Sequence, residues 1–205
     1  MPFTYPGSRV VRRHAPSGYT DYSSFKPWLR DEFTFRCVFC LLRERMLGSI
    51  GQAGFAVEHL TPRAADPTLE CEYANLLYAC SQCNSFKGDL GPVLDPCRAA
   101  YAGHLLVNDD GSIRGLTREG RTLIRVVRLD REELVSFRRR LIAMVAAAQA
   151  DPQTPLSRQV LELLLSYPSD MPDLRTLRPP ANGQPQSADD CHFALAERGE
   201  LAATY

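Results

Sequence analysis

The stretches Cys37-Val-Phe-Cys40 and Cys80-Ser-Gln-Cys83 decide the fold of this chain, because each places two cysteines three positions apart. Two such pairs can supply the four thiolates of a tetrahedral zinc site. A zinc ion bound by both pairs would hold together the two ends of the segment between them. We therefore predict a structural zinc site that fixes the position of the residues that it encloses.

Between and directly after the cysteine pairs lie side chains that suit metal-assisted hydrolysis. Glu58 and His59 follow the short apolar stretch 55–57, which predicts a strand that ends at these two residues. Asn75 comes before the second pair and Asn84 directly after it. Carboxylate and amide oxygens are ligands for a hard cation, and an imidazole is suited to act as a general base. The sequence thus predicts a hard-cation site beside the zinc site.

The composition is that of a globular chain with one main domain. It has 205 residues, 44% of them hydrophobic, and equal numbers of basic and acidic residues, 24 each. The overall charge therefore gives no reason to expect a nucleic-acid partner, and phosphate binding must come from local clusters. One cluster is Arg138-Arg139-Arg140 on a predicted helix, where a solvated face is the first interpretation and contact with a nucleic-acid backbone the second.

Cysteine usage favours a reducing compartment. The chain has seven cysteines, but the paired spacing and the lack of an N-terminal apolar signal segment indicate reduced thiols and a cytoplasmic location. Cys71, Cys97 and Cys191 are expected to be small hydrophobic residues or free thiols without a metal role. The longest apolar run, residues 141–148, is too short to span a membrane, so we expect a soluble protein.

Local patterns predict the elements around the two pairs. Apolar residues at helical intervals predict a helix over 24–35, and three glycines in 48–54 predict a loop. Residues 73–78 return the chain to the second cysteine pair. Directly after that pair, Asn84 is expected to begin a short helix that Gly88 ends.

Beyond the second pair, a hairpin and helices are expected. The turn at 108–111 ends in Asp-Gly, which favours a β-hairpin between 105–107 and 112–114. Thr117 can cap one helix, and Asp130 with Glu133 resembles a capping box for a longer one to about residue 150. A last helix is expected over about 156–166. His14, His104 and His192 are expected at the surface or as hairpin residues, not as ligands.

These patterns place the chain in the α+β class. The expected regions are an irregular N-terminal arm (1–22), a core with the zinc site (23–96), a hairpin and helical extension (97–166), and a tail rich in Pro, Ala and Asp (167–205).

The ordered motifs resemble the zinc-stapled branch of the HNH endonuclease family over about residues 36–90. The motifs are Cys37-Val-Phe-Cys40, Val57-Glu58-His59-Leu60-Thr61-Pro62, Tyr73-Ala-Asn75-Leu76-Leu77 and Cys80-Ser-Gln-Cys83-Asn84-Ser-Phe-Lys87-Gly88. The resemblance implies a ββα-metal core, flanked by helices and a C-terminal helical extension. The segment after residue 94 is more loosely similar to extensions of HNH proteins in bacterial phage-defence and retron-type systems, which implies a defence-system partner protein.

The same resemblance implies a role for each matching position. His59 would be the general base that takes a proton from the attacking water, and Asn75 would orient it through hydrogen bonds. Glu58 and Asn84 would bind one catalytic Mg²⁺ or Mn²⁺. Lys87, together with Arg63, would contact phosphate.

Two positions depart from the usual family pattern. Glu58 stands where the family usually has Asp, which lengthens the side chain by one methylene and leaves the metal geometry open. Asn84 stands where the signature often has a second His, and its harder oxygen favours Mg²⁺ or Mn²⁺ over zinc.

The function implied is metal-dependent hydrolysis of phosphodiester bonds, with double-stranded DNA as the partner, leaving 5′ phosphate and 3′ hydroxyl ends. Three alternatives stay open at this point. One is a zinc-containing nucleic-acid-binding module without catalysis, and another is an HNH nuclease that acts on RNA. The third is a protein-interaction subunit built around the helices after Thr117.

Overall fold

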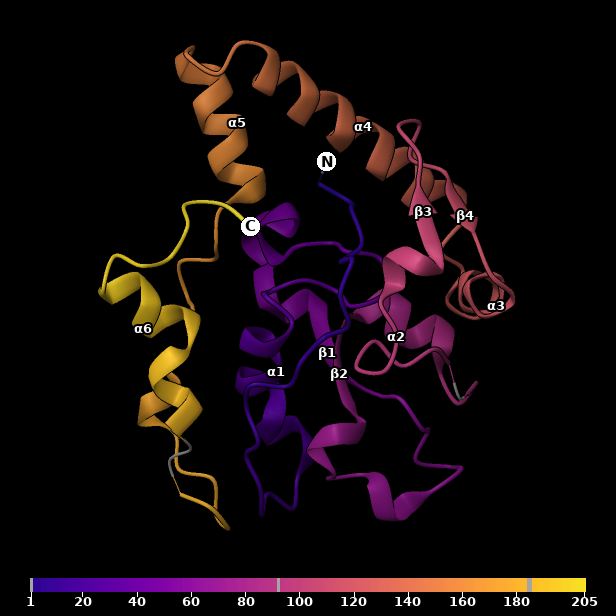
Figure 1. The fold of residues 1–205 in the computed structure, drawn as a ribbon, viewed down its shortest axis with the longest axis vertical. Coiled ribbons are helices and arrows are strands. Elements are labelled where there is room, and N and C mark those ends of the chain that lie inside the picture. The colour runs from indigo at the N-terminus through magenta and orange to yellow at the C-terminus, as the bar shows by residue number, and fades with distance from the viewer. Residues whose placement is uncertain (1, 92, 184–185) are drawn as a thin grey trace.

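The computed structural model of the chain describes residues 2–91, 93–183 and 186–205 (Figure 1). Within these residues the strands form two antiparallel pairs, β1 with β2 and β3 with β4. The helices and strands are, in chain order, α1 (Lys26–Glu32), β1 (Phe55–His59), β2 (Leu76–Cys80), α2 (Ser81–Lys87), β3 (Leu105–Val107), β4 (Ile113–Gly115), α3 (Arg118–Val127), α4 (Glu132–Ala150), α5 (Pro155–Leu165) and α6 (His192–Glu197). Mixed α and β architecture is what the sequence predicts.

The centre of the structure is a strand, strand, helix unit. β1 and β2 pair with Phe55 opposite Cys80 and His59 opposite Leu76. The strand predicted to end at Glu58 and His59 is confirmed. Helix α2 begins directly after β2, and both α1 and α2 contact the two strands, on either side of them in the view of Figure 1. Trp28 of α1 is fully buried and belongs to the core.

Two boundaries near this centre differ from the prediction. Helix α2 begins at Ser81, one turn earlier than the predicted Asn84, because Cys80 takes the N-cap position without a side-chain cap that the sequence could signal. Gly88 ends the helix with a φ of 47°, as expected. The predicted loop 48–54 is instead part of a run of 3₁₀ turns, Glu44–Gly54, interrupted at its glycines.

The first predicted helix is also shorter than expected. Its first residues form a 3₁₀ turn, Tyr22–Phe25, and α1 ends at Glu32. Thr34 and Phe35 follow with φ values of 54° and 53°, which a helix does not permit. The chain therefore turns sharply before the first cysteine pair.

The predicted hairpin and the helix capped by Thr117 are confirmed. β3 pairs with β4, and the Thr117 hydroxyl accepts a hydrogen bond from the Gly120 backbone N–H at 3.1 Å. A Cβ on Gly120 would lie 2.0 Å from the His104 carbonyl oxygen, so α3 can approach the hairpin this closely only with glycine there.

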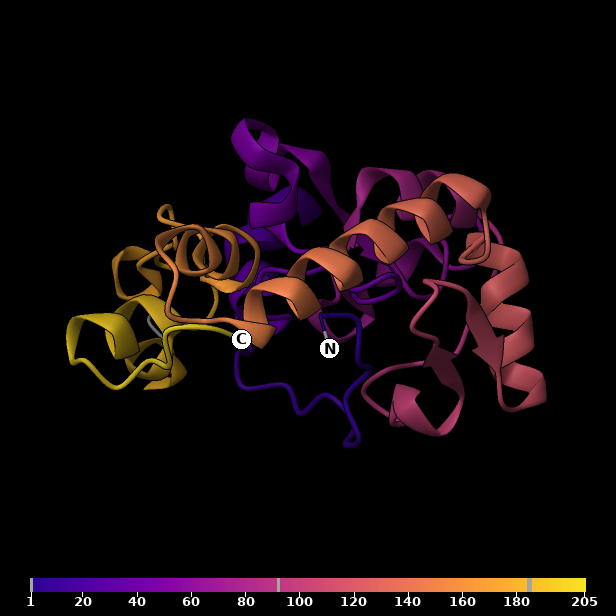
Figure 2. The same ribbon diagram turned by 90° about the horizontal axis from the view of Figure 1, so that it is seen from above.

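The long helix does not use the predicted capping box. Arg131 is the N-cap of α4 and makes no side-chain cap hydrogen bond, so Asp130 does not cap it. Helix α4 crosses the top of the molecule and is joined to α5, which contacts the 3₁₀ run (Figure 2). Additional short 3₁₀ turns lie at Pro67–Leu69, Tyr73–Asn75, Tyr101–Gly103, Leu174–Thr176 and Gln186–Asp190.

The two terminal regions are irregular but belong to the core. Phe3 and Tyr5 of the N-terminal arm are buried, and the Tyr5 hydroxyl donates to the Phe39 carbonyl at 2.6 Å. Leu174 and Ala194 of the C-terminal region are fully buried. The C-terminal region is therefore packed against the rest of the protein and includes α6.

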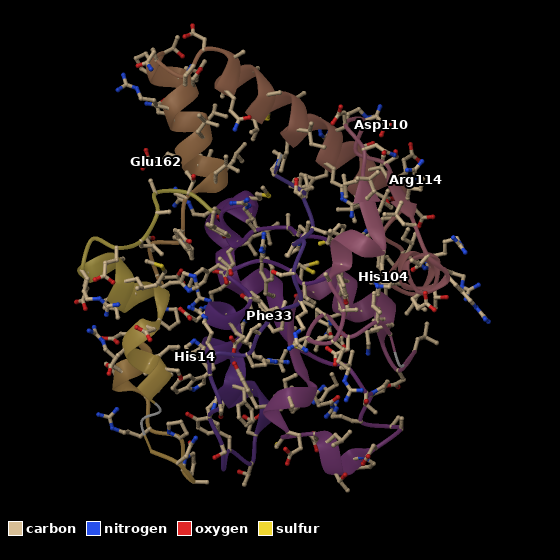
Figure 3. All side chains as sticks on the ribbon, in the orientation of Figure 1. His14, Phe33, His104, Asp110, Arg114 and Glu162 are labelled. Carbon is tan, nitrogen blue, oxygen red and sulfur yellow. The ribbon has the colours of Figure 1, made fainter. Side chains whose placement is uncertain are left out.

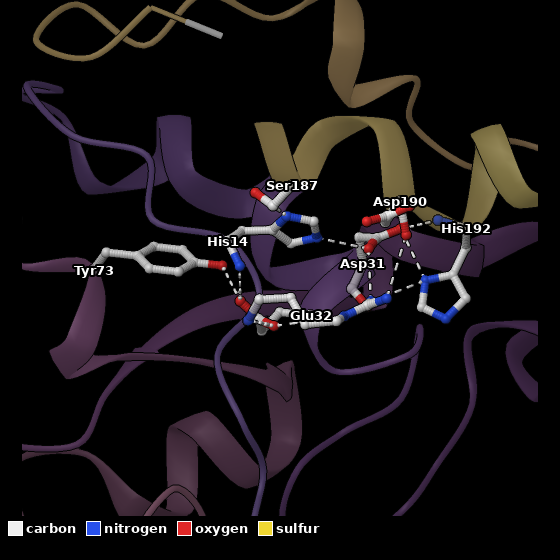
Figure 4. A network of polar contacts seen from close by, with 8 residues as sticks. His14, Asp31, Glu32, Tyr73, Ser187, Asp190 and His192 are labelled. Carbon is white, nitrogen blue, oxygen red and sulfur yellow. Dashed lines mark hydrogen bonds and ion pairs between the residues drawn. The ribbon is translucent and has the colours of Figure 1, made fainter. Parts of the chain in front are cut away.

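A buried polar network joins both terminal regions to α1 (Figure 4). Asp31 is fully buried and accepts from His14 Nε2 at 2.8 Å, from His192 Nδ1 at 2.9 Å and from Arg13 Nη2 at 2.9 Å. Burial works to raise the pKa of Asp31, but its hydrogen bonds to the two histidines outweigh it, and the pKa lies well below the ordinary value. The prediction that His14 and His192 lie at the surface is wrong, because both are partners of this carboxylate.

Among the described residues, no helix has both the length and the apolar character required to cross a membrane.

Candidate functional site

Four cysteine sulfurs meet at one end of the β1–β2 pair. Cys37 and Cys40 lie in the turn after α1, where the Cys37 carbonyl accepts from the Leu41 N–H at 3.0 Å. Val38 N–H donates to the Tyr78 carbonyl of β2 at 2.9 Å, which joins this turn to the strand. Cys80 ends β2, and Cys83 lies in the first turn of α2.

The geometry of this cluster fits zinc. The sulfurs of Cys37, Cys40, Cys80 and Cys83 all lie within 4.8 Å of one another, and all four residues are buried. The Sγ atoms of Cys40 and Cys80 are 3.7 Å apart. A tetrahedron with Zn–S bonds of about 2.3 Å has sulfurs about 3.8 Å apart. The chain therefore has a cysteine cluster that could hold a zinc ion.

The electrostatics of the cluster also favour a cation. Burial raises the pKa of Cys37 well above its ordinary value, whereas hydrogen bonds from Cys37, Cys40 and Cys83 lower the pKa of Cys80. The four thiols interact in a buried space, where several thiolates are unfavourable without a compensating positive charge. A bound cation would supply that charge. Arg131 Nη2 lies 4.0 Å from Cys83 Sγ and can donate to a thiolate there.

Glu58 and Lys87 form a buried ion pair next to the cluster. Their side chains are 4% and 0% exposed, and Lys87 Nζ lies 2.9 Å from Glu58 Oε1 and 2.6 Å from the His59 carbonyl oxygen. Lys87 comes four residues after Cys83, on the same buried face of α2. Its ammonium group therefore lies beneath the surface, and the expected contact of Lys87 with phosphate does not fit this placement.

The second oxygen of the Glu58 carboxylate has no partner. Oε2 is buried and makes no hydrogen bond to any described residue. Burial raises the pKa of Glu58 to about 7 despite the attraction of Lys87. An orphaned buried oxygen on a carboxylate costs free energy, and a bound cation would supply the missing partner.

His59 presents one ring nitrogen for chemistry. Its Nε2 lies 3.0 Å from the Glu70 carbonyl oxygen, which can only accept, so Nε2 carries the proton and Nδ1 has the free lone pair. Burial lowers the pKa of His59, so the ring is neutral near pH 7. The ring of Tyr22 meets it edge to face at a centroid distance of 4.9 Å and limits its rotation.

Asn75 closes the loop that follows His59. Its Oδ1 accepts from the Thr61 N–H at 2.8 Å, and its Nδ2 donates to the carbonyls of Thr61 at 3.0 Å and Leu69 at 3.2 Å. These bonds fix the segment that includes Glu70, the partner of the His59 ring. Asn75 thus orients His59 through this loop.

A polar pocket of about 250 Å³ brings the remaining predicted residues together. Glu58, His59, Arg63 and Asn84 all line it. Asn84 lies on α2, and its side chain makes no hydrogen bond to the described part of the chain. Arg63 is exposed, pairs with Glu70 at 2.9 Å and lies over the Tyr22 ring.

Two further residues of the pocket are absent from the sequence prediction. Tyr22 positions His59, and Asp89 places a second carboxylate at the rim directly after Gly88. The position of Asp89 next to the Lys87-Gly88 motif is a signal that could have found it. No local pattern marks Tyr22, because its contact with His59 spans 37 residues of sequence.

Other residues considered from the sequence lie elsewhere. Arg138, expected on a solvated face, is fully buried and donates from Nη1 to the Leu129 carbonyl at 2.8 Å. That carbonyl follows the end of α3 and needs a donor. Cys71, Cys97 and Cys191 are outside the four-cysteine cluster.

Removing the charge of Lys87 should destabilise the protein. Lys87→Met leaves the Glu58 carboxylate buried without a counter-charge, which costs about 3–5 kcal/mol. Urea unfolding of the zinc-loaded protein measures this loss. The loss of stability should be larger at about pH 8 than at pH 5. A carboxyl whose pKa is raised in the folded state lowers the free energy of unfolding as the pH rises above its unfolded-state pKa, and Lys87→Met removes the charge that offsets this effect.

The matched control for this test is Glu58→Gln/Lys87→Met, which removes both charges. This double variant should recover much of the loss. A Lys87→Met variant that costs no more than an exposed pair, about 0–1 kcal/mol, would contradict the buried pairing.

Cation binding at Glu58 should depend on pH. With a pKa of about 7, Glu58 is mostly protonated at pH 6 and mostly ionised at pH 8. We expect Mn²⁺ to bind about tenfold more weakly at pH 6, because the proton must leave first. Electron paramagnetic resonance of free Mn²⁺ measures the affinity. An affinity that does not change between these pH values would exclude Glu58 as a ligand.

In comparisons with known proteins, no family model matches this sequence, and no curated protein matches it either.

Proposed function

We propose that the protein is a metal-dependent nuclease of the HNH type that hydrolyses phosphodiester bonds in double-stranded DNA. The observation that carries the proposal is the pocket in which Glu58, His59 and Asn84 meet. It combines a buried carboxylate oxygen without a partner, a free amide side chain and a neutral imidazole with one free nitrogen. The strand, strand, helix unit with its cysteine cluster supports the same assignment.

Each residue has a distinct task in this proposal. His59 Nδ1 takes a proton from a water molecule, whose oxygen then attacks phosphorus. The bond from phosphorus to the 3′ oxygen breaks, and that oxygen takes a proton from solvent, which leaves a 3′ hydroxyl and a 5′ phosphate. Glu58 and Asn84 would hold an Mg²⁺ or Mn²⁺ ion, which when bound neutralises charge on the phosphate and the leaving oxygen.

The charges of the site suggest that cation and substrate bind together. Lys87 neutralises Glu58, and Asn84 brings no charge, so only Asp89 at the rim adds net negative charge. A phosphate group would supply the anionic oxygens that the protein lacks. Arg63, released from Glu70, could contact the same phosphate.

Cleavage assays with defined substrates test this function. Zinc-loaded protein with Mg²⁺ or Mn²⁺ should cleave duplex DNA and leave ends that DNA ligase rejoins, since the ligase requires a 5′ phosphate and a 3′ hydroxyl. Preferential cleavage of structured RNA would move the substrate to RNA. Binding of nucleic acid with no cleavage under either metal, including with a co-purified defence partner, would favour a binding module instead.

A further inference from the structure

The solvent face of α3 carries a row of arginines. Arg118, Arg121, Arg125 and Arg128 follow one another at intervals of three, four and three residues, and all are exposed. At about 100° per residue, these positions fall within about 80° of one another around the helix axis. The buried face of α3 is made by other residues, namely Gly120, Leu123, Ile124 and Val127. We call the four exposed residues the α3 arginine row.

The guanidinium groups of this row have no ion-pair partner in the described part of the chain. The acidic residue of α3 is Glu119, which lies about 100° or more away around the helix. In Figure 3 the exposed Arg114 on β4 and the exposed Asp110 of the hairpin turn lie on the same outer side as α3, whereas Glu162 lies on the far side, on α5. The α3 arginine row thus has four positive charges against the single acidic residue of α3, in a chain without net charge.

The α3 arginine row lies on a helix that contacts an element of the candidate active site. Helix α3 contacts α2, which carries Asn84, and the guanidinium group of Arg128 lies 5.0 Å from the Phe86 ring centroid of α2. From Asp89 the chain continues past Gly91, where a Cβ would lie 2.9 Å from Pro62. Val93 and Leu94, together with Arg118, Glu119 and Thr122, line a depression of about 210 Å³.

Arg128 combines a left-handed backbone conformation with a side-chain contact to α2. It is the C-cap of α3, with φ 52° and ψ 49°, the left-handed region where glycine is favoured. An arginine adopts this conformation only at a cost in free energy relative to its ordinary backbone conformations. Its guanidinium group shares the Phe86 ring with that of Arg131, 5.2 Å from the centroid, which holds both charges at the α2–α3 junction.

We infer that the α3 arginine row is a binding surface for the phosphate backbone of duplex DNA next to the cleavage pocket. This inference rests on the proposed function and adds where the duplex lies. Helix α3 is about 15 Å long, which corresponds to the axial rise of about four phosphates of one strand. Guanidinium groups bind phosphate oxygens through two parallel hydrogen bonds, and these contacts position a duplex without selecting sequence.

The test compares DNA binding by two triple variants of equal charge. One is Arg118→Gln/Arg121→Gln/Arg125→Gln. The control is Arg139→Gln/Arg140→Gln/Arg158→Gln, which removes three exposed arginines of α4 and α5. Fluorescence anisotropy with a labelled DNA duplex of mixed sequence, zinc-loaded protein and no added Mg²⁺ or Mn²⁺ measures affinity at several salt concentrations.

We expect the α3 variant to bind at least about tenfold more weakly, and its salt dependence of log affinity to fall by about 0.9 for each lost phosphate contact. The control variant should keep the wild-type affinity and slope. Equal effects of both variants, or an unchanged α3 variant, would overturn the inference. Tighter binding of duplex RNA in competition would overturn the choice of DNA.

The same experiment separates this inference from the proposed function. If wild type binds DNA through α3 but does not cleave it with Mg²⁺ or Mn²⁺, the surface stands and the nuclease assignment fails. If wild type cleaves DNA and the α3 variant binds and cleaves equally well, the surface fails alone. A wild-type protein that binds no nucleic acid would overturn both.

Discussion

His59→Ala is expected to lower the rate of plasmid nicking in the presence of Mn²⁺ by about 10²–10⁴-fold. The loss follows from the single free nitrogen of this ring. Because Nε2 is held by the Glu70 carbonyl, Nδ1 alone can take a proton, and no other described imidazole lines the pocket. A supercoiled plasmid assay measures the rate, since one cut per molecule converts the substrate to the open circular form.

Two controls separate chemistry from folding in this test. His104→Ala removes a half-buried histidine whose Nδ1 contacts Thr117 Oγ1 at 2.7 Å, away from the pocket, and it should keep most of the activity. Added imidazole should partly restore nicking by His59→Ala. Free imidazole can replace a missing general base, but it would not repair a defect in folding. Nicking by His59→Ala within a few fold of wild type would rule out His59 as the general base.

Cys80→Ser should have the largest effect on stability. Its sulfur lies 3.7 Å from that of Cys40, and the residue joins β2 to α2 at the N-cap of the helix. Complete thiolate sets in zinc-finger peptides bind zinc with about 10–16 kcal/mol, so loss of one ligand should lower the free energy of unfolding by on the order of 5 kcal/mol. Zinc quantification together with thermal unfolding measures both consequences.

The matched control is Cys71→Ser, because Cys71 lies outside the cluster and is only partly buried. It should retain one zinc ion per chain and the wild-type unfolding temperature. A Cys80→Ser protein with full zinc content and normal unfolding would show that the cysteines do not form a structural metal site.

The sequence predicts those parts of the fold that local patterns encode. Neighbouring residues encode three of these parts: the cysteine pairs, the strand that ends at His59 and the hairpin with its Asp-Gly turn. The structure contains the four-cysteine cluster, the strand and the hairpin. The cap of α3 at Thr117 is of the same kind. The start of α2 is not, because Cys80 gives no cap signal.

Long-range polar pairing could not be predicted from the sequence. Asp31 is an ordinary helix carboxylate by pattern, yet it is buried by His14 and His192, which come from opposite ends of the chain. The ion pair of Lys87 with Glu58 could not be predicted from the sequence for the same reason. The position of Lys87 in the motif indicates a phosphate contact, but the first turn of α2 begins at Ser81, and this register places Lys87 on the buried face against Glu58.

The placement of Lys87 also changes how the site is expected to work. Lys87 pairs with one oxygen of Glu58 and leaves the other without a partner, while burial raises the pKa of this carboxyl to about 7. The site is therefore expected to bind a cation more tightly when a phosphate contributes further oxygens, and the exposed Arg63 and the α3 arginine row can hold the rest of that substrate.

The most direct test of this account is the rate of plasmid nicking by zinc-loaded wild-type protein as Mn²⁺ is added. Two separate sites predict that nicking is absent with zinc alone, rises to saturation with Mn²⁺, and leaves one zinc ion per chain bound throughout. No nicking at any Mn²⁺ concentration, or equal nicking with zinc alone, would contradict the division into a structural cysteine site and a catalytic pocket at Glu58, His59 and Asn84.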